Sequence, residues 1–204
     1  YKRQPWDSSS AEFEARHNEG RTDVKHLRTL AFKPDGTRMF VGGKDDPSTT
    51  GKIKQFTLTN PWDLSSGVSD AGLSDDLGGA EPNLRNAQFD PNGSILYIGG
   101  NDNDNIHKFT LSTAWDVTSI SSSFTTFDLN SGFSQMRGFI FVAGFTRLYV
   151  VDDTSTTSTI LEYSPSCSAI TCSDPSDDGD VKAIIEANVE LSKTQYKFFL
   201  FILC

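Results

Sequence analysis

The chain has 204 residues, with 27 Asp and Glu against 18 Lys and Arg, and its formal net charge at pH 7 is -9. With 36% hydrophobic and 22% charged residues it can bury a core, which excludes a disordered tail and an integral membrane protein. The acidic balance argues against a nucleic-acid partner, because binding to phosphates depends on Lys and Arg. The chain begins at Tyr1, and we expect it to be a fragment of a larger repeat protein.

Four landmarks recur along the chain in the same order. An aromatic residue precedes a turn at Phe32, Phe89 and Phe141, and these positions lie 57 and 52 residues apart. Three further landmarks follow, namely an apolar triplet, an apolar run that contains an aromatic residue, and a Trp-Asp pair. Because these landmarks recur together, the sequence predicts an internal repeat. The triplets are MFV (39–41), LYI (96–98) and LYV (148–150), the runs are IKQFTL (53–58), IHKFTL (106–111) and ILEYSP (160–165), and the Trp-Asp pairs are 6–7, 62–63 and 115–116.

Each unit is predicted to consist of β-strands. Residues 27–32, 37–43 and 52–58 alternate or run apolar over strand lengths and contain β-branched and aromatic residues. The turn PDG at 34–36 becomes PNG in the next unit, where Gly supplies the positive φ of a tight hairpin. A weaker fourth strand follows each Trp-Asp pair, most clearly at 122–129. The sequence therefore predicts an all-β fold of repeated four-stranded antiparallel units, each about 50–57 residues long.

Four short antiparallel strands in a unit of this length resemble the blades of β-propellers. The segment FKPDGTRMFV (32–41) is similar to the pattern F-x-P-D-G-x-x-[MLF]-[YF]-V of YVTN-type and lactonase-like propellers, and FDPNGSILYI (89–98) nearly matches it, while FVAGFTRLYV (141–150) loses the Pro-Asp. The resemblance covers about residues 1–165 and implies a partial β-propeller. The expected divisions are the tail of a truncated blade (1–25), blades at 26–82 and 83–135, a partial blade (136–165), a polar linker (166–180) and a C-terminal segment of unknown role (181–204).

The Trp-Asp pairs do not indicate a WD-repeat protein, because blades of that family are shorter and carry an upstream Gly-His that this chain lacks. Asp63 precedes LSS and Asp116 precedes VTS, so each carboxylate is expected to accept hydrogen bonds from backbone N–H groups just downstream. We expect the tryptophans to fill apolar space between neighbouring blades rather than to bind a ligand.

One basic residue recurs near the start of the first strand of each unit. Arg28, Arg85 and Arg137 occupy this position in HLRTLAF, NLRNAQF and QMRGFIF. The first strand of a propeller blade lines the central channel, so the arginines are candidates for a partial ring that binds carboxylates or phosphates through bidentate hydrogen bonds. The alternative is that each arginine pairs with an acid on the next blade and only holds the ring together.

Acid-rich loops follow the second strand of each unit, and NDNDN (101–105) offers oxygen ligands for calcium. Asp102 and Asp104 are therefore metal candidates, although the loop lacks the ligand spacing of a calcium-binding hand and such residues are common in hairpin loops. No Gly-x-Ser-x-Gly elbow and no His-x-x-x-His pair are present, so no catalytic residue is predicted. The resemblance leaves a lactonase-like hydrolase with a metal at the channel mouth as the rival interpretation, with Asn83 and Asn86 as its inner-strand candidates.

The C-terminal stretch differs from the repeats. Cys167 and Cys172 are close enough in sequence for a disulfide loop, with free thiols as the alternative. The final apolar run FFLFILC (198–204) is too short to span a membrane. We expect a non-catalytic binding or structural module whose ligand is a protein, an anionic small molecule or a glycan, and whose open blade edges favour association. Loops rich in Ser, Thr, Asn and Asp suit an extracellular or cell-envelope location.

Overall fold

The computed structural model describes residues 13–18, 23–44, 51–75, 77, 79–102, 104–127, 129, 135–142, 144–153 and 157–164. All of them belong to one compact unit, Tyr1–Ser164, and the second unit, Pro165–Cys204, falls outside the described residues. The predicted linker, the C-terminal segment and the cysteine pair at 167 and 172 lie in that second unit. Within the part of the chain that is described, no helix has the length and apolar character needed to cross a membrane.

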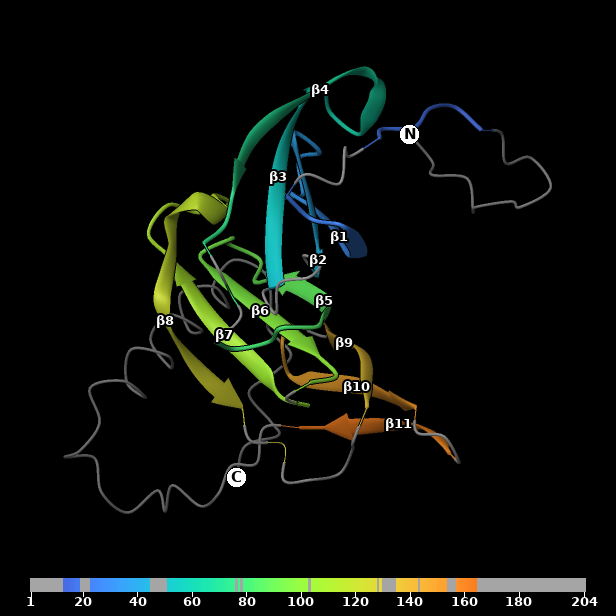
Figure 1. The fold of residues 1–204 in the computed structure, drawn as a ribbon, viewed down its shortest axis with the longest axis vertical. Helices are drawn as coiled ribbons and strands as arrows, with labels where there is room; N and C mark the ends of the chain where they lie inside the picture. The colour runs from blue at the N-terminus through green and yellow to red at the C-terminus, as the bar shows by residue number, and fades with distance from the viewer. Residues whose placement is uncertain are drawn as a thin grey trace, which may run out of the picture. The chain divides into compact units, whose positions relative to one another are not determined.

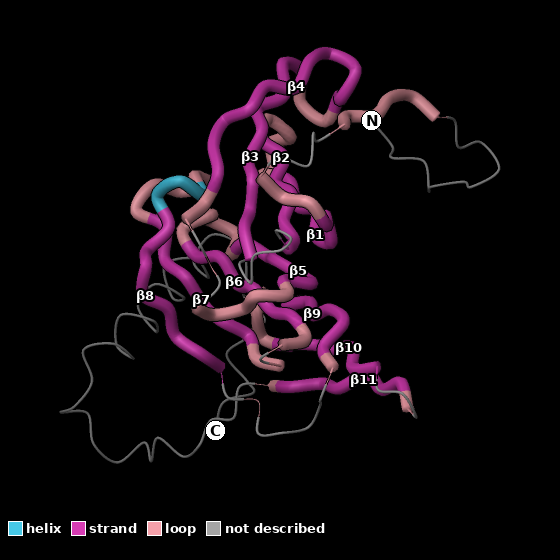
Figure 2. Tube along the Cα trace, in the orientation of Figure 1, coloured by secondary structure: helices cyan, strands magenta, loops and turns pink. Residues whose placement is uncertain are grey.

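The described residues form three antiparallel sheets, each built from strands that pair in chain order (Figures 1 and 2). Two sheets have four strands and the third has three, so the prediction of an all-β, partial β-propeller is confirmed. The first sheet contains β1 (His26–Phe32), β2 (Arg38–Lys44), β3 (Gly51–Asn60) and β4 (Asp63–Leu73). The second contains β5 (Leu84–Phe89), β6 (Ile95–Gly100), β7 (Ile106–Leu111) and β8 (Ile120–Phe127), with the 3₁₀ helix η2 (Val117–Ser119) before β8, and the third contains β9 (Met136–Val142), β10 (Arg147–Asp153) and β11 (Ser158–Tyr163).

The turn glycines and the tryptophans after the third strand form one packed unit. Gly36 (φ +74) and Gly93 (φ +72) adopt the left-handed conformation, and a Cβ on either glycine would overlap the indole of Trp62 or Trp115. The amide of Trp62 donates to the Gly36 carbonyl at 3.1 Å, and that of Trp115 donates to the Gly93 carbonyl at 2.8 Å. The hairpin turn and the Trp-Asp loop therefore recur together, because the indole packs against the turn glycine and the tryptophan amide bonds to its carbonyl.

The aspartate of each Trp-Asp pair closes its own loop, as predicted. Asp63 Oδ1 accepts hydrogen bonds from the Ser65 amide at 2.8 Å and from its hydroxyl at 2.6 Å. Asp116 Oδ1 accepts the same two bonds from Thr118, at 3.0 and 2.7 Å, at the start of η2. Asp116 Oδ1 also accepts a bond from Gln55 Nε2 of the first sheet at 2.9 Å. The second carboxylate therefore joins two sheets as well as closing a loop.

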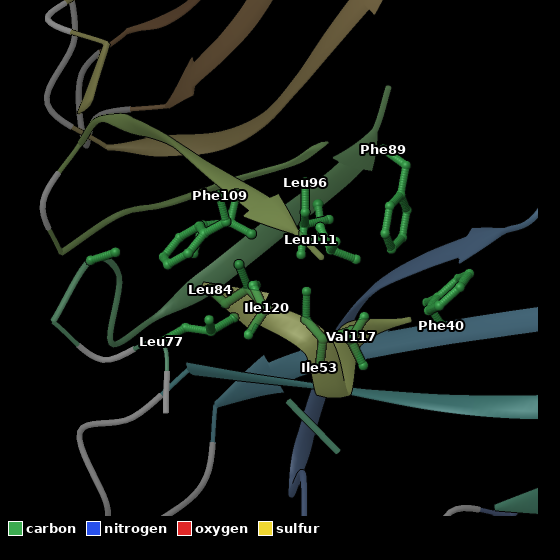
Figure 3. Close-up of a cluster of buried hydrophobic side chains, with 13 residues drawn as sticks. Phe40, Ile53, Leu77, Leu84, Phe89, Leu96, Phe109, Leu111, Val117 and Ile120 are labelled. Carbon is green, nitrogen blue, oxygen red and sulfur yellow. The ribbon is translucent and has the colours of Figure 1, made fainter. Parts of the chain in front are cut away.

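An aromatic ring from the second strand of one sheet packs into the next sheet. The Phe40 ring of β2 lies 4.5 Å from the Phe89 ring of the second sheet, and Figure 3 shows these two side chains together in the buried cluster. Tyr97, the equivalent residue of β6, lies 4.6 Å from Phe141 of the third sheet. The buried clusters that join the sheets are built around these rings; the larger one contains Phe40, Ile53, Leu77, Ala80, Leu84, Ala87, Phe89, Leu96, Ile98, Phe109, Leu111, Val117 and Ile120.

The two described tryptophans differ in their surroundings. Trp115 packs between the first and second sheets, with its ring 5.1 Å from Phe89 and 6.4 Å from Phe40, so the predicted space-filling role is confirmed for it. Trp62 packs on Phe32 of its own sheet at 5.2 Å and is 59% exposed. For Trp62 the prediction was wrong, because no described residue lies on its other side in the way that Phe40 lies beside Trp115.

Hydrogen bonds between neighbouring inner strands hold β1, β5 and β9 side by side. The Ala87 amide donates to Thr29 Oγ1 at 3.0 Å, which joins β5 to β1. Gln88 forms two hydrogen bonds with the backbone of Phe141 in β9. Its Nε2 donates to the carbonyl at 3.0 Å, and its Oε1 accepts from the amide at 2.8 Å. These bonds fix the spacing of the residues that the three inner strands carry.

Replacing Gly93 by Ala tests the dependence of the turn on Trp115. The variant combines a strained positive φ with overlap at the indole, so we expect its free energy of unfolding to fall by about 2 kcal/mol or more in urea titrations. Gly144 is the matched control, because it has φ +67 but nothing lies within 4 Å of a Cβ placed there. Equal losses in the two variants would show that backbone conformation alone, and not the indole, requires glycine.

Replacing Asp116 by Asn tests the bond between sheets. Burial alone would raise the pKa of Asp116, but bonds from Thr118 and Gln55 and the charge of Arg38 hold it below its ordinary 3.8. The ionised carboxylate of Asp116 therefore stabilises the fold above pH about 4, the ordinary pKa of an aspartate. This stabilisation is lost as the pH falls through the lower pKa that Asp116 has in the folded chain. We expect the variant to lose about 1 kcal/mol at neutral pH, and the difference from the unmodified chain to vanish in acid.

The control for that substitution is Asp63→Asn, which changes the same loop bond at a carboxylate that has no bond to a neighbouring sheet among the described residues. Chemical unfolding of both variants at neutral and acidic pH separates the two contributions. A loss at Asp63 as large as that at Asp116 would contradict a role for the carboxylate between the sheets.

Candidate functional site: an arginine row on the inner strands

Each of the three predicted arginines is the extra residue of a β-bulge. In β1 the residues on either side of Arg28 pair with consecutive glycines of β2, 43 and 42, so Arg28 itself has no partner in the ladder. Arg85 of β5 and Arg137 of β9 are skipped in the same way. A bulge redirects the side chain of its extra residue and is common beside functional sites. The sequence placed the arginines in one register, and the structure places all three on the same backbone irregularity.

The double glycines near the ends of β2 and β6 leave room for these bulges. A Cβ on Gly43 would overlap the carbonyl of His26, and one on Gly100 would overlap the carbonyl of Asn83. These glycines therefore admit a close approach of the inner strand.

The arginines lie close enough together to influence one another. Burial lowers the pKa of Arg85, and the charges of Arg28 and Arg137 lower it further. Asp102 and Glu81 act in the opposite direction without reversing the shift. The positive charges of Arg28 and Arg137 therefore act on the Arg85 guanidinium, and a bound anion would offset their repulsion.

The hydrogen bonds of the three guanidinium groups leave donors available. The Nη1 atom of Arg28 is buried and has no hydrogen-bond partner. Arg85 Nε donates to the neutral amide oxygen of Asn101 at 3.1 Å. Arg137 Nε lies 3.4 Å from a carboxylate oxygen of Asp153, which belongs to the same sheet. Among the described residues, none of the three arginines forms an ion pair with a neighbouring sheet, which is what the alternative interpretation required.

Asn83 and Asn86, the candidates of the rival hydrolase interpretation, have different surroundings. Asn86 Nδ2 donates to the Phe139 carbonyl, so this side chain ties β5 to β9. Asn83 Nδ2 donates to Asp102 Oδ1 at 3.2 Å, and its Oδ1 atom is buried without a hydrogen-bond partner. Asn83 therefore lies beside the arginine row, whereas Asn86 has a structural role.

The two metal candidates are both engaged in hydrogen bonds. Asp102 Oδ1 accepts the bond from Asn83, and Asp104 Oδ1 accepts one from the Met136 amide at 2.9 Å. Asp104 also adopts a positive φ of 51°, which lets its carboxylate cap the start of β9. Among the residues that the structure describes, no three His, Cys, Asp or Glu side chains are grouped to hold a metal ion. Calcium at this loop remains a prediction.

A hollow of about 450 Å³ lies at the opposite ends of the same inner strands. Leu30, Phe139 and Ile140 contribute to its walls, together with Trp115. Its amide side chains are already used between strands, as Gln88 binds the backbone of β9. The hollow therefore has mainly apolar walls, with Asp90 as its charged lining residue, and the three arginines lie at the other end of the inner strands.

Comparison with protein-family models and with curated protein sequences finds no match. Among solved structures, a chain of the nidogen–laminin complex is similar at 15% identity and a TM-score of 0.45, covering 68% of this chain and 44% of that one. Hydrazine synthase of Kuenenia stuttgartiensis is similar at 15% identity and a TM-score of 0.42, covering 69% of this chain and 46% of that one. Sqt1 of Chaetomium thermophilum is similar at 14% identity and a TM-score of 0.36, covering 71% of this chain and 36% of that one. The chain spans less than half the length of each, and these similarities identify neither a family nor a function.

Proposed function

We propose that this chain is a non-catalytic binding module of a β-propeller, and that Arg28, Arg85 and Arg137 bind an anionic group at the start of the inner strands. The observation that carries the proposal is the shared bulge, because it presents the same cation from three neighbouring strands. The lowered pKa of Arg85 is consistent with it, because burial lowers this pKa and the nearby charges of Arg28 and Arg137 lower it further.

The ligand chemistry follows from the donors. Guanidinium groups bind carboxylate and phosphate oxygens through paired N–H donors, and they stay charged at every physiological pH. The unpartnered Nη1 of Arg28 is a donor whose burial favours such a bond, because a buried N–H without an acceptor is costly. A carboxylate or phosphate borne by a protein, a glycan or a small molecule fits this row. The turn motif resembles that of YVTN-type blades, and a binding role for the inner strands is compatible with this resemblance.

A hydrolase is the weaker candidate for the same surface. Asn86 Nδ2 donates to a backbone carbonyl of β9, so this side chain already has a structural use between the inner strands. The arginine row would also repel a divalent cation placed beside it. We therefore assign binding rather than catalysis to this end of the inner strands.

The proposal predicts that the chain binds inorganic phosphate and citrate, with citrate binding more tightly because it can contact more than one arginine. Replacing Arg85 by Gln should weaken citrate binding roughly tenfold or more in isothermal titration calorimetry. Arg85→Lys keeps the charge but loses the paired donors, so its affinity for citrate should lie between that of the unmodified chain and that of Arg85→Gln. Raising the salt concentration should weaken every one of these interactions.

Arg147→Gln is the matched control, because Arg147 is a half-exposed arginine of β10 paired with Glu162 and lies outside the row. It should bind citrate as the unmodified chain does. If the variant with all three row arginines replaced by Gln bound both anions unchanged, or if neither anion bound the unmodified chain, the proposed function would be wrong.

A further inference from the structure

The hollow on the inner strands is large enough to hold a small molecule. Its volume of about 450 Å³ lies within the range of about 300–1,000 Å³ that is usual for ligand pockets. Its walls consist mainly of aliphatic and aromatic side chains, and Phe32, Phe89, Trp115 and Phe145 supply the rings. Such walls suit an apolar molecule or the apolar part of a larger ligand.

The three inner strands carry both the arginine row and the hollow. In β5 the residues that line the hollow begin at Asn86, directly after Arg85, and continue to Phe89. In β1 and β9 the lining begins two residues after the arginine, at Leu30 and Phe139. Because a strand rises about 3.3 Å per residue, Phe89 lies on the order of 13 Å from Arg85 along the strand. One extended small molecule is therefore long enough to contact both features.

Two large aliphatic side chains of the hollow are open to solvent. Leu30 of β1 is 60% exposed and Ile140 of β9 is 51% exposed, and both line the hollow. Exposed apolar side chains that gather at a hollow are typical of a binding surface, because a ligand that covers them removes apolar area from water. An alkyl chain lying in the hollow would cover this area.

The two ends of the inner strands carry opposite charges. Asp90 is the charged residue among the described residues that line the hollow, and it is 8% exposed. Its carboxylate is held in place, since Oδ1 accepts a hydrogen bond from the Ile95 amide at 2.7 Å and Oδ2 accepts one from the Asn92 amide at 3.2 Å. A negatively charged group is therefore repelled at the hollow and attracted at the arginine row. An anion with an apolar chain is thereby oriented with its charged end at the arginines.

We propose that the ligand of the arginine row is an amphipathic carboxylate, whose charged group contacts Arg28, Arg85 and Arg137 and whose alkyl chain lies in the hollow. This inference rests on the proposed function, because the arginines supply the contacts to the charged group. It narrows the ligand from an anion of any kind to a small molecule with one charged end and one apolar end.

Isothermal titration calorimetry of the full chain with butanoate, hexanoate and octanoate tests the inference. These carboxylates share one charged group and differ only in chain length. Complete burial of one methylene group strengthens binding about fourfold. Because Leu30 and Ile140 leave the hollow partly open to solvent, we expect about twofold for each methylene, and octanoate should bind roughly tenfold more tightly than butanoate.

Two kinds of variant separate the charged group from the chain. Ile140→Ser and Leu30→Ser each remove apolar wall, so each should reduce the gain from butanoate to octanoate about threefold and leave citrate binding unchanged. Both residues are at least half exposed, so both variants should stay folded, which urea titration checks. Phe124→Ser removes an exposed ring of β8 that does not line the hollow, and it should bind octanoate as the unmodified chain does. Arg85→Gln should weaken butanoate and octanoate by the same factor.

The outcomes distinguish a failure of this inference from a failure of the proposed function. If citrate binds but octanoate binds no more tightly than butanoate, or if the gain survives in both serine variants, the hollow does not hold the chain and the inference is wrong, while anion binding stands. If Arg85→Gln leaves octanoate binding unchanged, the charged group does not lie at the row and the inference is also wrong. If neither citrate nor any of the three carboxylates binds, the proposed function fails and the inference fails with it.

Discussion

The contact between an aromatic ring of one sheet and the turn-and-tryptophan unit of the next is the constraint on which the rest of the structure depends. Phe40 reaches Phe89 and Trp115, and Trp115 has room only because Gly93 lacks a side chain. This arrangement sets the distance between sheets. It thereby sets the spacing of the inner strands, whose amide and hydroxyl side chains then bond directly from strand to strand.

Because the inner strands are held at this spacing, the three arginines become neighbours. A bulge at each of them turns the side chain away from the ladder, and the double glycines of the adjoining strands accommodate two of these bulges. Packing and the proposed recognition therefore have the same origin, since the repeat that buries the aromatic rings also repeats the cation. The acids beside the row are Glu81, Asp102 and Asp153, and the one ion pair described within it, Arg137 with Asp153, lies between half-exposed groups.

Much of this could be predicted from the sequence, because strands, turns and the Trp-Asp loops are local patterns. The bonds of Asp63 and Asp116 to Ser65 and Thr118 follow from residues two positions apart. The bulges could not be predicted, because the residue pattern does not show where the pairing between an inner strand and the next strand shifts by one residue. The exposure of Trp62 was missed for a related reason: its repeat equivalent, Trp115, is partly covered by another sheet, and sequence similarity carries no information about whether that sheet is present.

The central claim is that the bulged arginines act together on an anion, and side-chain NMR of arginine tests it most directly. Spectra of the ¹⁵Nε–H groups recorded during a citrate titration report each guanidinium separately. The account predicts saturable shifts of Arg28, Arg85 and Arg137 with one common Kd, while Arg147 stays unchanged. Shifts that grow linearly for every arginine, or a row that does not respond, would contradict it.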